Sequence, residues 1–543
     1  MPEYDPPQVQ NINDLPPETL LHIFSELNPR DIYRCSVICK RWNDMIEGDM
    51  RLQEIINASV MGLSHGMPDY LPLYRKDQAL LRYFDAWTFL DWTNDTSEAR
   101  VGDPDSSCTV LFRGHMLARK FEGDRNIYIY RVRTCTRLRP AFDWVVKPNI
   151  DCDSFTMDPL QFILVLMRTT ETTPTTADLE VHFRDIFKGD HLSTRTPMAS
   201  VTITTLQQHN IKCEGQVAGR HVGVLWYDEN HRYNWDMTSV VVWNWYTGDK
   251  VLHIIGRDIY SFCFLDELRV LVASTRFTGD GSTAMLVYDL MEHTSDRTYM
   301  PREELFVRND PSRIPSPLRL FSPRDECLDS IVTICAYSHP NEEDDGADDV
   351  IKIFVPASKL RARLASWAPG ASMPWDTWGV PDTHVRTTAG LPESEQRYDT
   401  VVGMHALELV PPEQDQQTPL RVFDFDHRRL LLFEKGYPEE NVEQYDATVR
   451  ITRSSHVGPA WNGTEFTTYL PLVESSVAIS PKLWFLERLV DDEALIFFNL
   501  DKPDRIEHIK IMCGFRRFPP EILEHTRQQL GPETYALHFG PRS

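Results

Sequence analysis

The sequence contains no long apolar run and no excess of positive charge. None of its hydrophobic stretches approaches the roughly 18 residues that a membrane-spanning helix requires. Its 80 acidic and 56 basic residues give a net charge of −24, whereas a surface for nucleic acid or anionic lipid needs an excess of Lys and Arg. We therefore expect neither nucleic acid nor a membrane among the partners of this chain.

The ten cysteines lack the spacing of a disulfide framework or a zinc site. No two of them form a C-x-x-C pair, and the 18 histidines contain no H-E-x-x-H motif. The first ten residues, MPEYDPPQVQ, are acidic and proline-rich rather than basic and then apolar, as a secretion signal would be. We expect reduced thiols, no metal or other cofactor, and a location in the cytoplasm, the nucleus or both.

The motifs of common catalytic and nucleotide-binding sites are missing as well. Neither G-x-S-x-G nor a P-loop occurs. Residues 279–284, GDGSTA, match a dinucleotide-binding pattern, but a strand-like run follows them where that fold requires a helix. We therefore predict no catalytic residue in this chain.

The first 60 residues have the pattern of several short helices. Apolar residues recur at helical spacing over 20–27. Asn28 and Pro29 predict the start of a second helix, because Asn caps helix N-termini and Pro suits the first turn. Further stripes around Trp42 and over 52–63 predict two more helices. So small a unit hides too little surface to be stable alone, so it packs either on the rest of the chain or on a partner.

The residues of this unit resemble the F-box family. The family pattern is Leu-Pro, an Ile-Phe pair, a Leu, an Asp and then Val-Cys-Lys-x-Trp, and the sequence matches it without a gap, with Ile in place of Val. The resemblance implies a three-helix module that binds the Skp adaptor of cullin-type ubiquitin ligases. It also implies eight adaptor-binding residues: Leu15, Pro16, Leu20, Ile23, Phe24, Leu27, Ile38 and Trp42.

A further helix is predicted over residues 75–92, where apolar side chains share one helix face. A polar stretch with Gly and Pro follows it and predicts a domain boundary before residue 108. The expected segments of the chain are a tail (1–11), the helical F-box domain (12–60), a linker helix (61–95), a β domain (108–530) and a C-terminal tail (531–543).

From residue 108 onward, short runs of strand-forming residues alternate with polar, proline-rich stretches. Seven similar runs recur about every 61 residues, and most follow another strand-like run, which is typical of a propeller or a stacked array. Four of the seven carry an aromatic residue, then Asp or Asn, then an apolar residue, which is similar to the end of a WD repeat. The seven runs begin at residues 127, 179, 240, 285, 351, 420 and 494.

We therefore predict a multidomain α plus β protein. Its N-terminal three-helix F-box and linker helix precede a large all-β domain, a divergent WD-like β-propeller of about seven blades. A pair of β-sandwiches is the structural alternative.

Four arginines fall within nine residues at the first of the strand-like runs. Side chains two residues apart share a strand face, and guanidinium groups bind phosphate and carboxylate bidentately. We predict a site for an anionic, phosphorylated partner, with scattered surface charges as the alternative. The four residues are Arg131, Arg133, Arg137 and Arg139.

These features together predict the substrate-recognition subunit of a Skp–cullin–F-box ubiquitin ligase. The F-box would bind the Skp adaptor and, through it, a cullin ligase, while the β domain would bind a target protein. The chain would catalyse nothing itself and would act by raising the effective concentration of the target. The alternatives are a cullin-independent F-box scaffold or regulator, and a propeller hydrolase with a helical docking module.

Overall fold

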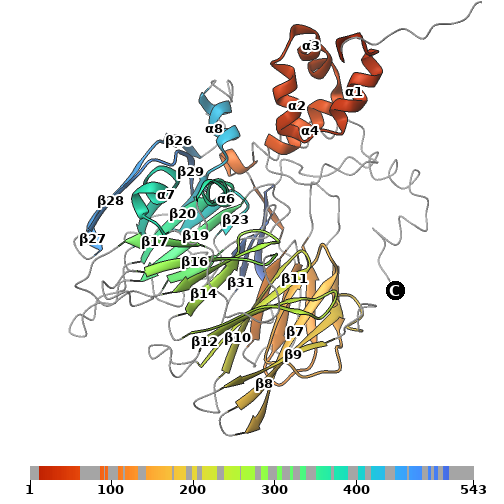
Figure 1. The fold of residues 1–543 in the computed structure, drawn as a ribbon, viewed down its shortest axis with the longest axis vertical. Helices are drawn as coiled ribbons and strands as arrows, with labels where there is room; N and C mark the ends of the chain where they lie inside the picture. The colour runs from red at the N-terminus through yellow and green to blue at the C-terminus, as the bar shows by residue number, and fades with distance from the viewer. Residues whose placement is uncertain are drawn as a thin grey trace, which may run out of the picture.

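The structure is a computed structural model of the 543-residue chain (Figure 1). It describes an N-terminal segment and many segments between residues 86 and 512. The described residues are 12–60, 86–90, 92–95, 108–113, 116–132, 142–173, 176–190, 198–204, 211–228, 238–256, 259–274, 283–291, 303–308, 318–321, 330–337, 350–367, 372–388, 401–409, 418–434, 447–461, 464–479, 487–490, 494–498 and 506–512.

Residues 12–60 fold into the N-terminal helical module, as the apolar spacing predicted. The start of its second helix is also as predicted, because the side chain of Asn28 accepts a hydrogen bond from the backbone N of Asp31 at 3.0 Å and Pro29 occupies the first turn. Its elements are η1 (Ile12–Asp14), α1 (Pro17–Ser25), α2 (Pro29–Ser36), α3 (Lys40–Gly48) and α4 (Met50–Val60).

The described part of the β region contains eight sheets. Seven of them, each of four or five mainly antiparallel strands, follow one another along the chain and are here called blades 1 to 7, while the eighth is a two-stranded sheet within an insertion. In blades 1 to 4 the four main strands are hydrogen-bonded in sequence order. They are β2 (Cys108–Arg113), β3 (Met116–Phe121), β4 (Ile127–Arg131) and β5 (Phe142–Val146); β6 (Ser154–Asp158), β7 (Ile163–Thr173), β8 (Thr176–Asp185) and β9 (Met198–Thr204); β10 (Ile211–Ala218), β11 (His221–Asp228), β12 (Thr238–Asn244) and β13 (Lys250–Gly256); and β14 (Ile259–Phe264), β15 (Arg269–Ser274), β16 (Thr283–Asp289) and β17 (Glu303–Arg308).

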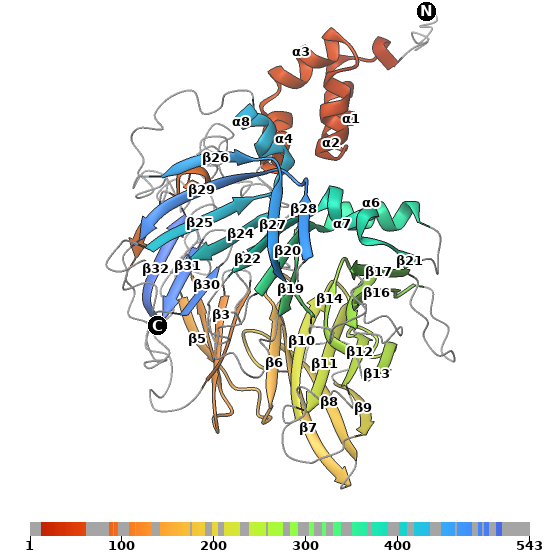
Figure 2. The same ribbon diagram turned by 90° about the vertical axis from the view of Figure 1, so that its left-hand side faces the viewer.

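Blades 5 and 6 keep this order but carry insertions between their third and fourth strands (Figure 2). Blade 5 contains β18 (Leu318–Phe321), β19 (Ile331–Tyr337), β20 (Val350–Pro356) and β22 (His384–Thr388), with α6 (Ala357–Ser366), β21 (Ser372–Met373) and α7 (Trp375–Asp382) inserted. Blade 6 contains β23 (Val401–Val402), β24 (His405–Leu409), β25 (Thr418–Asp424) and β29 (Leu472–Ile479), with α8 (His427–Glu434), β26 (Thr448–Thr452), β27 (Ser455–Trp461) and β28 (Thr464–Thr468) inserted.

Blade 7 joins the two ends of the β region. Its strands β30 (Glu487–Val490), β31 (Ala494–Phe498) and β32 (Ile506–Met512) come from the end of the region, whereas its outermost strand is β1 (Trp92–Asp95), which pairs antiparallel with β32. The sequence assigned residues 92–95 to the linker, but the structure places them in this sheet. A blade that combines strands from both ends of the region ties these two ends together, as in other propellers.

The first strand of each blade lies beside the first strand of the next, through β2, β6, β10, β14 and β18. This neighbourhood, together with blade 7, gives the propeller-like array of seven blades that the sequence predicted. The cores lie between successive blades, so both faces of central strands such as β12 and β15 are buried. That burial explains why these strands have continuous apolar runs. The seven predicted runs coincide with β4, β8, β12, β16, β20, β25 and β31.

The Asp or Asn near the end of several third strands caps the turn that follows. Asn244 accepts hydrogen bonds through Oδ1 from the backbone N atoms of Tyr246 (3.0 Å) and Thr247 (3.3 Å). Asp185 of blade 2 caps its turn in the same way, bonding the N atoms of Phe187 (2.8 Å) and Lys188 (2.9 Å). The repeated polar position therefore stabilises the turn between the third and fourth strands.

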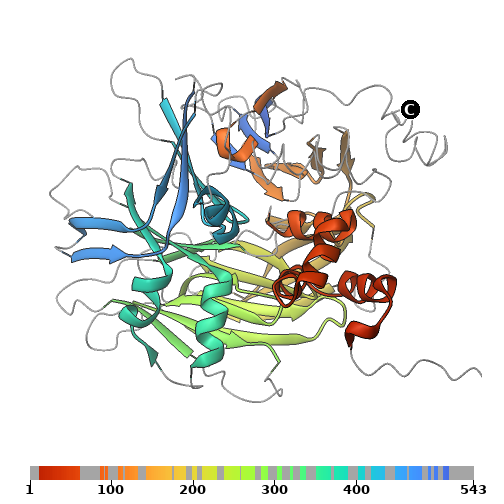
Figure 3. The same cartoon turned by 90° about the horizontal axis from the view of Figure 1, so that it is seen from above.

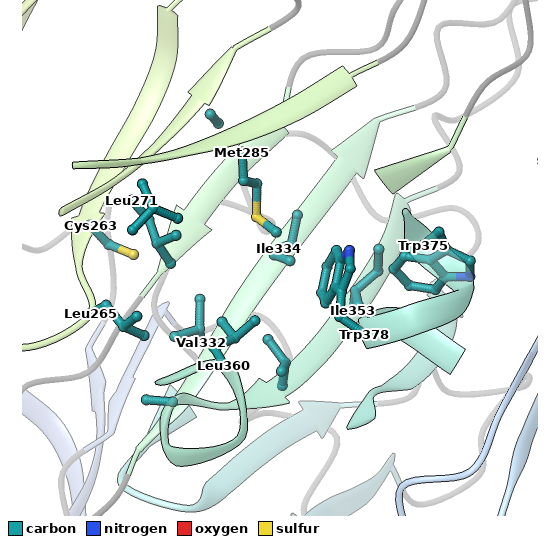
Figure 4. Close-up of a cluster of buried hydrophobic side chains, with 14 of the residues drawn as sticks. Cys263, Leu265, Leu271, Met285, Val332, Ile334, Ile353, Leu360, Trp375 and Trp378 are labelled. Carbon is teal, nitrogen blue, oxygen red and sulfur yellow. The ribbon is translucent and has the colours of Figure 1, made fainter. Parts of the chain in front are cut away.

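The insertions of blades 5 and 6 begin where β20 and β25 end, so they leave the sheets on the same face of the array. We call this the insertion face. Helices α6 and α7 lie across the strands of blades 4 and 5 (Figure 3), and strand β21 pairs parallel with the outer strand β17 of blade 4. Trp378 of α7 is fully buried near Ile353 and Met285 (Figure 4). The blade 5 insertion thus fills the junction between two blades.

Candidate functional site

The N-terminal helical module has an apolar core of its own. Leu20, Phe24 and Trp42 are buried in it, and the rings of Phe24 and Trp42 meet edge to face with centroids 5.2 Å apart. Leu15 and Leu27 pack partly buried against this core. Five of the eight predicted adaptor-binding residues therefore contribute to the packing of the module itself.

The other three predicted residues, Pro16, Ile23 and Ile38, are exposed. Ile38 keeps 63% of its surface in contact with solvent. Further exposed apolar residues in this module were not predicted from the sequence. They are Ile12, Tyr33, Val37 and Met50. An accumulation of exposed apolar side chains on so small a unit is typical of a protein-binding surface.

The turn between α2 and α3 carries the most exposed part of this surface. Tyr33 and Val37 are one helical turn apart, with 58% and 70% of their surfaces exposed, and Ile38 follows directly. Ile32 and Cys35 of the same helix face the core instead. The spacing of Tyr33 and Val37 was visible in the sequence as an apolar pair at i and i+4, but the family pattern does not include either residue.

Hydrogen bonds from one arginine help to hold the module in this shape. The Arg41 guanidinium donates hydrogen bonds to the backbone carbonyl oxygens of Asn13 and, at 3.1 Å, of Leu15. It thereby fixes the segment before α1 against the start of α3.

Burial, together with the carboxylate of Asp31, raises the pKa of the Cys35 thiol, so this cysteine stays neutral and serves as a packing residue.

Of the four arginines predicted to bind an anion, the structure describes one. The Arg131 guanidinium lies above the ring of Phe142, 5.8 Å from its centroid. Arg133, Arg137 and Arg139 lie outside the described residues, as does the acidic run 342–349. The anion site therefore stays a prediction.

Residues 86–90, just before strand β1, are packed into the β region on the insertion face. Trp87 is only 2% exposed and stacks on His405 at the start of β24, with ring centroids 4.2 Å apart and an interplanar angle of 13°. The His405 Nε2 atom lies 3.4 Å from a carboxylate oxygen of Asp424, whose Oδ2 is also 3.0 Å from Nη1 of the buried Arg429. This cluster anchors the end of the N-terminal segment to blade 6.

The charges in the cluster are balanced. Burial alone would raise the pKa of Asp424, but Arg429 and His405 outweigh burial and lower the pKa to about 2. The carboxylate is therefore ionised at neutral pH and compensates the charge of Arg429. A buried arginine of this kind requires such a partner.

Within the part of the chain that the structure describes, no three His, Cys, Asp or Glu side chains gather as metal ligands. No described helix is long and apolar enough to cross a membrane.

Comparison with protein families matches residues 12–52 to the F-box-like family. This segment covers α1 to α3 and the start of α4, and the N-terminal module is therefore F-box-like. A search of curated proteins found no match.

Comparison with solved structures found matches that include a β-propeller domain. The β-propeller domain of the Trilobed protease from Pyrococcus furiosus, which has an open velcro topology, is 9% identical, with 78% of this chain and 100% of that chain covered and a TM-score of 0.23. Hsv2 from Kluyvelomyces marxianus is 10% identical over 48% of this chain and 72% of that chain, with a TM-score of 0.23. Acylaminoacyl peptidase from Pyrococcus horikoshii is 9% identical over 68% of this chain and 57% of that chain, with a TM-score of 0.26. At these identities and TM-scores the likeness carries no argument, and it is the strand pairing that defines the propeller-like array.

Proposed function

We propose that this chain is the substrate-recognition subunit of a Skp–cullin–F-box ubiquitin ligase. Its F-box-like module would bind the Skp adaptor, and its propeller-like region would bind a target protein. The single observation that carries the proposal is the F-box-like match over residues 12–52. The exposed apolar residues of this module support it, because they offer a surface for a partner while the core stays intact.

In this role the chain does no chemistry. It holds the target near the ubiquitin-conjugating enzyme and so raises the effective concentration of the target lysines. The anchor at Trp87 supports this role, because it ties the segment that follows the F-box-like module to blade 6. The proposed adaptor site and target site would then belong to one chain that is anchored at Trp87, between the F-box-like module and the blades.

The test measures binding of the purified full-length chain to a purified Skp adaptor by isothermal titration calorimetry. Ile38→Asp should weaken binding at least about 30-fold, because it places a charge within an apolar contact. Ile255→Asp on β13 is the matched control, since Ile255 is equally exposed at 65% but lies in blade 3. It should leave the affinity unchanged.

Two outcomes would contradict the proposal. One is an intact chain that does not bind the adaptor at micromolar concentration. The other is equal binding by the wild type and the Ile38→Asp variant. If the adaptor binds but a cullin is not recruited into the complex, the chain is a cullin-independent F-box scaffold or regulator instead.

A further inference from the structure

The exposed apolar residues of the described β region gather on one face of three neighbouring blades. Nine large apolar residues of this region are exposed, and six of the nine lie on turns of blades 2 to 4 at the insertion face. We call these six residues the apolar row. They are Leu160, Phe162, Phe187, Tyr246, Leu268 and Met291.

Three members of the row, Phe187, Tyr246 and Met291, occupy the same position, two residues after the end of a third strand. Their backbone N atoms donate to the side chain that caps the turn, at 2.8 to 3.0 Å. The turn fixes the backbone but not the side chain, because in blade 6 Asp424 caps its turn through the N of Asp426 in the same way, at 2.9 Å. A large apolar residue at this position therefore distinguishes blades 2 to 4 from blade 6.

At the junction of blades 4 and 5, a segment of this chain already covers the same face. Helices α6 and α7 bury Leu360, Leu364 and Trp378 there, against residues of both blades. The apolar row is what stays exposed on the described turns of blades 2 to 4 with that insertion in place. Covering of the insertion face by a segment that comes from another blade is thus a feature of this fold.

The described part of the chain also ends on the insertion face. Strand β32 is the third strand of blade 7, so it ends on this face, at Met512, as β25 does in blade 6. Met512 pairs with Trp92, which comes five residues after Trp87, and the ring of Trp87 stacks on His405 at the same face. Residues 513–543, here called the terminal segment, therefore begin on the face that carries the apolar row.

The terminal segment is rich in apolar residues and long enough to reach the row. At about 3.3 Å per residue, its 31 residues span up to about 100 Å, whereas a compact domain of about 420 residues has a radius of gyration of about 22 Å. Large apolar side chains gain stability from burial. The segment contains eight of them: Phe515, Phe518, Ile522, Leu523, Leu530, Tyr535, Leu537 and Phe539.

The charges of the two surfaces are compatible. Carboxylates outnumber cations on the turns of blades 2 to 4 at this face, with seven Asp or Glu and four Lys or Arg in 158–163, 185–190, 219–221, 244–250, 265–269 and 289–291. The terminal segment carries four arginines and three glutamates, in a chain of net charge −24. It is therefore not repelled by these turns, as an acidic segment would be.

We propose that the terminal segment docks on the apolar row of its own chain and covers the insertion face of blades 2 to 4. Because the segment is tethered, its effective concentration is of the order of 1 mM, so even a dissociation constant of about 0.1 mM would keep the row about 90% occupied. A second copy of the chain, or a partner that uses this face, would first have to displace the segment. The proposal does not depend on the proposed ligase role.

The test is photo-cross-linking of the full-length chain in the absence of the adaptor. The photoreactive residue p-benzoylphenylalanine replaces Phe187, Met291 or, as the control, Ile255, which is exposed on the outer strand of blade 3. We expect positions 187 and 291 to form cross-links within one molecule to residues 513–543, identified by mass spectrometry, and position 255 to form few. Cross-links mainly between two molecules, cross-links to another segment, no cross-links, or equal yields at all three positions would each overturn the proposal.

Variants of the terminal segment test whether its apolar residues carry the contact. Ile522→Asp/Leu523→Asp should lower the yield of these cross-links at least about fivefold. Gln528→Asp/Gln529→Asp is the matched control, because it adds the same charge to the same segment and removes no apolar side chain. Equal yields for the two variants would overturn the proposal. Since the adaptor is absent from this assay, its failure and failure of the proposed ligase role are separate results.

Discussion

Replacing Trp87 by alanine should weaken the whole β region, although residue 87 lies outside its seven blades. The side chain is almost fully buried and stacks on His405, so its removal leaves a large cavity next to the charged pair of Asp424 and Arg429. Large-to-small changes of this kind in a core cost about 3–5 kcal/mol for Trp or Phe. Residue 87 also lies five residues before β1, so the loss should loosen the strand that completes blade 7.

The measurement is urea unfolding of the full-length chain, followed by far-ultraviolet circular dichroism. We expect Trp87→Ala to lower the free energy of unfolding of the β region by about 3–5 kcal/mol, while adaptor binding is retained because the N-terminal helical module has its own core. Tyr246→Ala, an exposed aromatic on blade 3, should change the free energy by no more than about 0.5 kcal/mol.

A loss of less than about 1 kcal/mol in the free energy of unfolding for Trp87→Ala would refute this reasoning, since truncating a buried tryptophan costs more than that. It would mean that residues 86–90 do not contribute to the packing of blade 6. Loss of adaptor binding in the same variant would refute the separation of the two modules.

Other variants test charge and space in the β region and in the N-terminal helical module. Asp424→Asn should lower the free energy of unfolding by about 3–5 kcal/mol at pH 7, because it leaves Arg429 buried without its carboxylate. The Asp424 pKa of about 2 lies below the ordinary value of 3.8, so its stabilising contribution is complete above about pH 4 and is lost as the pH falls toward 2; the difference between wild type and Asp424→Asn should shrink over that interval in acid titrations of unfolding. Gly223→Ala should cost about 1–3 kcal/mol in urea unfolding, because its Cβ would meet the ring of Phe262 at 2.5 Å. Gly48→Ala, which has open space around it, should be neutral or slightly stabilising in the same assay.

Several central strands could be predicted from the sequence because both of their faces are buried between blades, which makes their sequences continuously apolar over most of their length. The runs at 240 and 285 are examples, and they became β12 and β16. The inner and outer strands are partly exposed and mix polar with apolar residues, so they gave a weaker signal. β10, in which buried, half-buried and exposed residues are mixed, is one of these.

Two assignments failed for reasons that only the tertiary structure supplies. Residues 92–95 pair with a strand some 400 residues later, and no local pattern carries information about so distant a partner. Asp185 caps a turn as Asn244 does, but Arg184 stands between it and the preceding aromatic residue, so the repeated motif was not recognised in blade 2.

In the candidate site, too, some features could be predicted from the sequence and others depend on the tertiary structure. The F-box pattern identified the residues of the module correctly, but a pattern does not separate residues that fill the core from those that face a partner. Leu20 and Ile38 belong to the same motif, yet one is buried and the other largely exposed. Tyr33 and Val37 were missed because exposure depends on how three helices pack together.

The pairing of β1 with β32 has a consequence for how the protein is made. At 5–20 residues per second, a ribosome needs roughly 20–80 s to synthesise the 410 residues (96–505) between these strands. During that time the F-box-like module, which has a core of its own, can fold, while the backbone groups of β1 stay unpaired. Nascent chains are therefore expected to need protection of this strand by a chaperone, and a ribosome that stalls before residue 506 would leave a chain with a folded F-box-like module but without a finished blade 7.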